Sequence, residues 1–225
     1  MTRAMTACWR VLQIADSGFP IGGFAHSSGF EAAFHFGEVG TAARLDDYLR
    51  AHLLNVANAS LPFVAAAYDG TGDVWALDAL LDAQLTNHVA NRASRTQGRA
   101  LLSTCARVFD EPPIAALAIR AASRDVAAHL APVFGAVLAA LSVARHDALA
   151  LHMLLALRGV ASAAVRLGVV GPHEAQRLQS RHAATLDALI AECAEIGPGE
   201  AAMAAPLLEI YGAMHDQLYA RLFQS

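Results

Sequence analysis

Residues 146–167, HDALALHMLLALRGVASAAVRL, decide the fold class. Apolar side chains fall on almost every side of a helix drawn over this stretch, and two-residue alternation is hard to find anywhere in the chain. A helix that is apolar all round belongs in the centre of a protein. Alanine and leucine favour helix, and they number 51 and 29 among 225 residues. The sequence therefore predicts an all-α protein with this helix at its core.

The apolar spacing on both sides of this stretch predicts further helices, separated by breaks at glycine and proline. Ser27 and Asp73 are expected to cap the N-termini of two of them. The clearest of these helices are predicted near residues 27–36, 73–85, 92–109, 132–141, 172–196 and 206–219. No repeat or long linker interrupts the pattern, so we expect a single compact domain, 1–225, of about nine to ten helices, with residues 220–225 as a tail.

The charged residues exclude several classes of protein. Sixteen arginines stand against 20 acidic residues, which gives a net charge of -4, and the chain contains no lysine. A phosphate-binding P-loop and a Schiff-base enzyme both need a lysine, so neither is expected. The arginines are spread along the chain rather than gathered in a basic arm. Nucleic-acid binding is therefore not expected either.

The cysteines and the apolar runs indicate a cytoplasmic protein. Cys8, Cys105 and Cys193 are odd in number and far apart, which argues against a disulfide framework or a cysteine zinc site and suits a reducing compartment. We expect no signal peptide in the first ten residues. The most apolar run, 131–144, contains Pro132 and is shorter than the roughly 20 residues that span a bilayer. No membrane helix is expected.

A search for catalytic or metal-binding motifs finds none. The position four residues after His173 is Arg177, so the H-E-x-x-H zinc motif is absent. His26 and His35 lie nine residues apart across a glycine, and a helical metalloenzyme that uses them stays an unfavoured alternative. Ser27 has a histidine beside it but no G-x-S-x-G elbow around it. The sequence predicts no catalytic residue, no bound metal and no cofactor.

Five arginines on predicted helices need an explanation. The side chains of Arg92, Arg95 and Arg99 share one helix face, which is either a solvated face with internal ion pairs or a contact surface for an acidic or phosphorylated partner. Arg158 and Arg166 interrupt the apolar central helix, where an unpaired charge is costly. Each must pair with a buried carboxylate or emerge at a contact surface.

The end of the chain carries two apolar side chains, Leu222 and Phe223. Terminal residues seldom hold apolar side chains without a place to bury them. These two residues either fold back onto their own domain or dock on a partner.

Five blocks that run in order along almost the whole chain resemble the urease accessory protein UreF family. They are LQIADSGFPIGGFAHSSGFEAA at 12–33, NRASRTQGRALL at 91–102, HLAPVFGAV at 129–137, SAAVRLGVVGPHEAQRLQ at 162–179 and PLLEIYGAMHDQLYARLFQS at 206–225. Phe19 and Phe30 stand where leucine is frequent in the family, which leaves the geometry of the matching partner surface open. No block is a catalytic motif. The resemblance implies an all-α, non-enzymatic scaffold for nickel insertion into urease.

The resemblance also implies partners and contact residues. It implies a homodimer that binds UreD, called UreH in some organisms, and recruits the GTPase UreG to the urease apoprotein. Arg166, the basic residue of the VRLG block, and the segment around Glu31 are expected to face the GTPase. The C-terminal segment with Tyr219, Arg221, Leu222 and Phe223 is expected to bind UreD.

Two related interpretations stay open at this stage. In the first, Arg166 is an arginine finger that activates GTP hydrolysis by UreG. In the second, the scaffold is a passive conduit through which nickel passes between partners. The lysine that binds GTP would belong to UreG, in agreement with its absence from this chain.

Overall fold

The computed structural model describes residues 3–123 and 125–225, and it confirms the all-α class: these residues form helices and no strand. The described residues form twelve α-helices, more than the nine to ten predicted, in part because the segment 172–196 divides at His182. They are α1 (Arg3–Ala15), α2 (Phe30–His35), α3 (Ala42–Ala59), α4 (Leu61–Asp69), α5 (Val74–Gln84), α6 (His88–Val108), α7 (Pro112–Ala121), α8 (Leu130–Ala140), α9 (Arg145–Arg166), α10 (Pro172–Arg181), α11 (Ala183–Cys193) and α12 (Pro206–Met214), with 3-10 turns η1 (Gly23–Ala25), η2 (Pro198–Glu200) and η3 (His215–Gln217).

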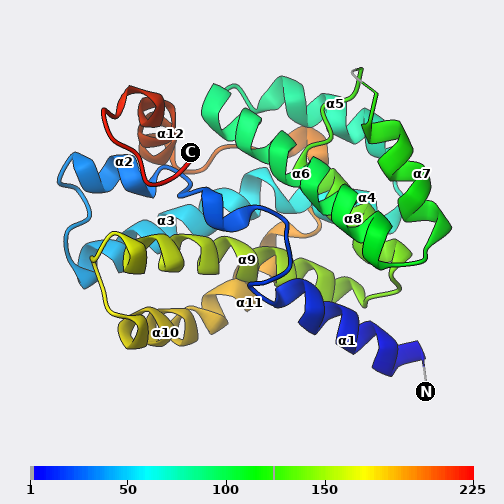
Figure 1. The fold of residues 1–225 in the computed structure, drawn as a ribbon, viewed down its shortest axis with the longest axis horizontal. Coiled ribbons are helices and arrows are strands. Elements are labelled where there is room, and N and C mark those ends of the chain that lie inside the picture. The colour runs from blue at the N-terminus through cyan, green and yellow to red at the C-terminus, as the bar shows by residue number, and fades with distance from the viewer. Residues whose placement is uncertain (1–2, 124) are drawn as a thin grey trace.

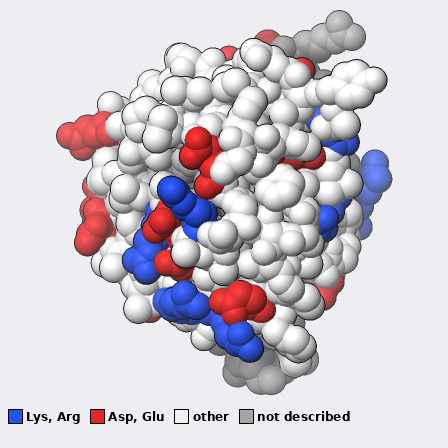
Figure 2. Space-filling model, turned by 90° about the vertical axis from the view of Figure 1, so that its left-hand side faces the viewer, with Lys and Arg blue, Asp and Glu red and all other residues white. Residues whose placement is uncertain are grey.

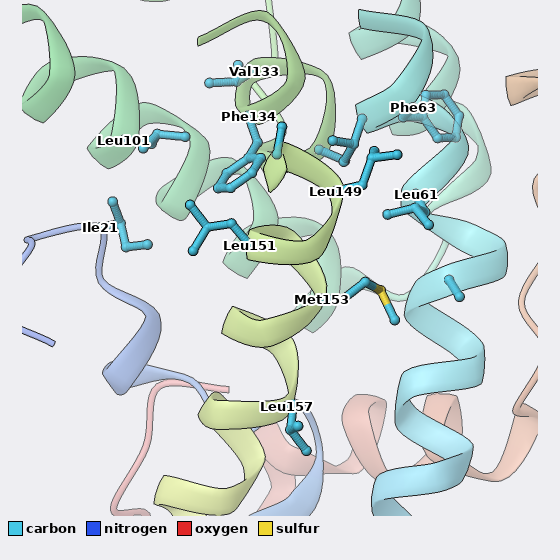
Figure 3. Packing of buried hydrophobic residues seen from close by; sticks show 14 of the residues in the cluster. Ile21, Leu61, Phe63, Leu101, Val133, Phe134, Leu149, Leu151, Met153 and Leu157 are labelled. Carbon is cyan, nitrogen blue, oxygen red and sulfur yellow. The ribbon is translucent and has the colours of Figure 1, made fainter. Parts of the chain in front are cut away.

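Helix α9 is the predicted central helix. It crosses the middle of the molecule and packs against α3, α4, α8, α10 and α11 (Figure 1). Figure 3 shows Leu149, Met153 and Leu157 directed from α9 into the core, where each is at most 1% exposed. By length and composition alone α9 is also long and apolar enough to cross a membrane. Its packing inside the bundle accounts for that composition, since a helix surrounded by others is apolar on most sides.

The closest helix packing joins α4 and α8. Gly135 allows it, because a Cβ atom at this position would lie 2.2 Å from the carbonyl oxygen of Val64 on α4. Phe63 of α4 and Phe134 of α8 are both fully buried (Figure 3). This contact therefore depends on close packing of the two helices.

The loop before α2 differs from its prediction. Ser28 and Gly29 both have positive φ angles, 55° and 82°, so the helix begins at Phe30 and not at the predicted Ser27 cap. The other predicted cap is confirmed, since the Asp73 carboxylate accepts hydrogen bonds from two backbone N–H groups at the start of α5. The left-handed turn directs the chain from η1 into α2. It also leaves the backbone around Ser27 free to bind another segment.

That segment is the end of the chain. Residues 215–225 follow α12 and run back beside α2, far from the N-terminal helix α1 (Figure 1). The loop 16–29, α2, the end of α9 and the C-terminal residues consequently meet at one place on the molecule.

Candidate interaction site

The C-terminal tail, residues 220–225, folds back onto its own domain. The backbone N–H and the hydroxyl of Ser27 both donate to the carbonyl oxygen of Ser225, at 2.5 and 2.9 Å. The N–H of Gln224 donates to the carbonyl of Ala25 at 2.7 Å. The side chain of Phe223 is only 6% exposed. Of the two alternatives for Phe223, burial in the same chain is the one observed.

The buried carboxylate of Glu31 binds the backbone of the tail. Its side chain is 1% exposed, and its carboxylate accepts hydrogen bonds from the backbone N–H groups of Leu222 and Phe223 at 2.5 and 3.2 Å. The Nε2 atom of His215 lies 2.8 Å from the same carboxylate. A buried carboxylate is costly unless hydrogen bonds satisfy it, and these three donors do so. A partner that approaches here meets the tail that Glu31 positions, and not the carboxylate itself.

Arg166 packs on the solvent side of the tail. This exposed guanidinium donates to the carbonyl of Phe24 at 2.6 Å and lies 4.2 Å from the centre of the Phe223 ring, a cation–π contact. Arg158 donates to the carbonyl of Ala15 and lies 5.7 Å from the centre of the Phe24 ring. Neither arginine forms an ion pair with a carboxylate among the described residues, although the charge of exposed Asp16 acts on Arg158. Pairing with a buried carboxylate was therefore the wrong alternative for both.

Three segments that are far apart in the sequence meet around Phe223. Glu31 binds its backbone and Arg166 covers its ring. The tail also presents apolar side chains outward, since Tyr219 just before it is 107% exposed and Leu222 is 51% exposed. We call Glu31, Arg166, Leu222 and Phe223 the tail site. Glu31 and Phe223 are buried and make their contacts within this chain, whereas the side chain of Leu222 is exposed.

The face of the molecule on the side of α2 and α12 shows acidic and basic side chains in mixed clusters, with wide uncharged areas between them (Figure 2). Several large apolar side chains of these segments are exposed, Phe36 to 46%, Leu207 to 65% and Ile210 to 52%. Single exposed apolar residues are normal, but several on neighbouring elements are typical of an interaction surface.

The predicted arginine face of α6 is partly paired. Arg92 forms a bidentate ion pair with Asp216, at 2.9 to 3.1 Å, and this hydrogen bonding lowers the pKa of the Asp216 carboxyl. Arg221 of the tail donates to the same carboxylate at 3.0 Å, so Asp216 joins α6 to the tail. Arg99 donates to the carbonyls of Ala121 and Val126. Arg92 therefore forms the internal ion pair that one interpretation predicts, whereas Arg99 binds backbone carbonyls instead of a carboxylate.

Comparison with known proteins identifies the family. The UreF family model matches residues 39–183. The chain is 38% identical to Urease accessory protein F of Arabidopsis thaliana, over 100% of this chain and 96% of the relative. The chain belongs to the UreF family. It is also 36% identical to Urease accessory protein F of Oryza sativa subsp. indica, over 96% of this chain and 84% of the relative. With UreF of Arthrobacter sp. (strain FB24) the identity is 30%, over 95% of both chains.

This UreF-family chain gathers no metal site among residues 3–123 and 125–225. No group of three His, Cys, Asp or Glu side chains is placed there to hold an ion. His26 lies under the tail, with Nδ1 2.6 Å from the hydroxyl oxygen of Ser225, whereas His35 is exposed at the end of α2. Burial lowers the pKa of His26, and electrostatic interactions with His215 and Arg92 lower it further. These two histidines have different environments and different contacts.

Sequence reasoning missed the residues that anchor the tail. His215, Asp216 and Ser27 each bind a group from a distant part of the chain. Ser27 and His215 lie inside blocks that resemble the UreF family, which was the available signal. Spacing within either block gives no reason to pair them.

Proposed function

We propose that this chain is a non-enzymatic scaffold of urease maturation. In this proposal it acts in the cytoplasm as a homodimer, binds UreD (UreH) and recruits and regulates the GTPase UreG at the urease apoprotein, so that nickel is inserted. One observation supports it most directly. The residues expected at two different partners, Arg166 and Glu31 for UreG and the tail for UreD, all contact one another through Phe223.

This arrangement suits a protein that couples two partners. UreD would cover the exposed side chains of Tyr219 and Leu222, and would thereby press on the tail. Any shift of the Phe223 ring would weaken its cation–π contact with the Arg166 guanidinium, which lies 4.2 Å from the ring centre. Binding at one surface would then alter affinity at the other, and by linkage the effect would be reciprocal.

The arginine-finger alternative is less well supported. A finger must extend into the active site of its GTPase, whereas the Arg166 guanidinium is held by the Phe24 carbonyl and the Phe223 ring of its own chain. A finger accelerates GTP hydrolysis by about 10³ to 10⁵-fold. A scaffold needs no such acceleration, so single-turnover hydrolysis by UreG with and without this chain separates the two functions.

The role of the tail is tested by deleting residues 220–225 and co-purifying the shortened chain with UreD. We expect the complex to be lost while the helical circular dichroism spectrum is retained, because the deleted residues contribute one buried apolar side chain, Phe223. Retention of the UreD complex by the shortened chain would show that the tail only packs on its own domain.

The role of Arg166 is tested by Arg166→Ala in a reconstitution with UreD, UreG and urease apoprotein. The expected result is an intact UreD complex with weaker UreG recruitment and lower nickel occupancy of urease. Arg177→Ala is the matched control, since Arg177 is an exposed arginine on α10 whose side chain is 70% exposed. Wild-type urease activation by the Arg166→Ala chain would remove this residue from the proposal.

A further inference from the structure

A second polar surface lies along the N-terminal half of α6. A groove of about 580 Å³ runs there between the end of α5 and α6, and its lining includes His88, Arg92, Arg95 and Arg99. No aspartate or glutamate belongs to the lining. We call it the arginine groove. Three arginines and no carboxylate in one lining are unexpected in a chain whose net charge is -4.

The cations of the arginine groove exceed the acidic groups around it. Arg92 and Arg221 share the single carboxylate of Asp216, and Arg99 binds only backbone carbonyls. Arg95 is exposed and has no ion pair or hydrogen bond among the described residues. Hydrogen bonds with Asn91 and His129 lower the pKa of the nearby Asp82 carboxyl, and the charge of Arg95 lowers it slightly further. The three arginines of the lining thus have a single ion-paired carboxylate among the described residues, that of Asp216 on Arg92, which leaves a local excess of positive charge.

We propose that the arginine groove binds an acidic segment of a partner polypeptide. From His88 to Arg99 the groove follows twelve residues of helix, which rise about 16 Å at 1.5 Å per residue. An extended peptide rises about 3.3 Å per residue, so about five residues cover this length. Carboxylates spaced along such a segment match arginines that recur at three- and four-residue intervals on one helix face.

The charge of the whole chain favours a polypeptide over nucleic acid. Nucleic-acid binding domains usually carry a strong overall positive charge, with a pI above about 9. This chain has a pI of about 6.2. The excess of positive charge is confined to one short groove, which suits a short acidic segment.

The preorganisation of the groove adds to this argument. Asp216 holds the guanidinium of Arg92, and the Ala121 and Val126 carbonyls hold that of Arg99. Two of the three arginines are thus fixed before a ligand arrives, and Arg95 between them is free to form a bidentate contact. Arg95 is therefore the residue on which affinity should depend most. This inference does not depend on the proposed contacts with UreD and UreG.

The test measures binding of a fluorescein-labelled octaglutamate peptide to the purified full chain by fluorescence anisotropy at low ionic strength. Arg95→Glu should weaken binding about tenfold or more, because it removes a charge-assisted contact and adds a repulsive charge. Arg107→Glu is the matched control, since Arg107 is an exposed arginine on the same helix about 18 Å beyond Arg95. It should change affinity less than about twofold. Both variants should keep the wild-type urea midpoint.

Each other outcome overturns the inference in a defined way. Absence of peptide binding, or an equal loss in Arg95→Glu and Arg107→Glu, would mean that the groove is not a specific site. Displacement of the peptide by an equal concentration of inorganic phosphate would indicate a site for small anions. Tighter binding of a single-stranded DNA oligonucleotide than of octaglutamate would indicate nucleic acid as the ligand.

Discussion

The contact between α4 and α8 and the tail site are held together in opposite ways. Between α4 and α8, Gly135 packs against the backbone of Val64, and the neighbouring Phe63, Val64 and Phe134 are fully buried and apolar. At the tail site, a buried carboxylate, a cation over an aromatic ring and backbone hydrogen bonds hold a short segment. The first contact depends on shape. The second depends on polar groups that a partner or water can also supply.

The difference indicates which part of the molecule can open. Two buried ring nitrogens near the tail, Nε2 of His26 and Nδ1 of His215, have no hydrogen-bond partner among the described residues. An unsatisfied buried polar group lowers the stability of the structure that buries it. Opening the tail would relieve this cost, whereas separating α4 from α8 would expose apolar surface. The tail site is therefore the weaker of the two and the more readily exchanged.

The largest expected effect concerns the core and its dependence on pH. Burial lowers the pKa of His52 and of His152 from 6.5 to about 4. The unfolded chain binds a proton at each residue near pH 6.5 and the folded chain does not until about pH 4, so stability is full above 6.5 and falls as the pH decreases toward 4. At pH 5 the loss is about 2 kcal/mol for each histidine.

Urea denaturation at pH 7.5 and at pH 5 measures this loss. The variant His152→Gln, which keeps a polar group near Ser60, should lose about 2 kcal/mol of this pH dependence at pH 5. An unchanged dependence in this variant would contradict the assignment to the buried histidines. Carboxylates whose pKa is lowered, such as that of Asp216, lose their contribution only at lower pH and do not affect the comparison.

A smaller effect of about 3 kcal/mol is expected from Gly135→Ala, because the new methyl group must push α4 and α8 apart. Gly159→Ala is the control within α9, since no atom lies within 4 Å of a Cβ at that position. This variant should be neutral or more stable by up to about 1 kcal/mol. Thermal unfolding of both proteins checks the pair. Equal unfolding temperatures would show that the α4–α8 contact tolerates extra volume.

The contrast also explains what could be predicted from the sequence. The central helix α9 and the Asp73 cap of α5 follow from residues within a few positions of one another, so local patterns predicted both. Arg166 was conspicuous because a cation interrupts an apolar helix. The hydrogen bond from Leu222 to Glu31 joins residues 191 positions apart, and no local pattern encodes it.

The resemblance to a family partly filled this gap, because it directed attention to Glu31, Arg166 and the tail as separate features. It did not indicate that they touch. Their common contact with Phe223 depends on the left-handed turn at Ser28 and Gly29, which brings α2 under the tail. A single helix of the predicted length, 27–36, would have placed Glu31 differently.

The smallest expected effect is local to the tail site. Glu31→Gln keeps the shape of the side chain but replaces one acceptor oxygen with a donor, which then faces an N–H group or the His215 ring. The tail should loosen by about 1 to 2 kcal/mol, while the core remains intact. Hydrogen exchange at the amides of Leu222 and Phe223 should accelerate about tenfold, with little change in the global urea midpoint.

Glu38→Gln is the matched control for this change, because Glu38 is an exposed glutamate just beyond α2. It should leave the exchange of both amides at the wild-type rate. If Glu31→Gln instead lowered the global midpoint as much as Gly135→Ala, the tail site would unfold together with the core, and the two regions would not be separable. Faster exchange at the tail alone would show that this segment opens while the helical core stays folded, as a segment that exchanges its own contacts for those of a partner must do.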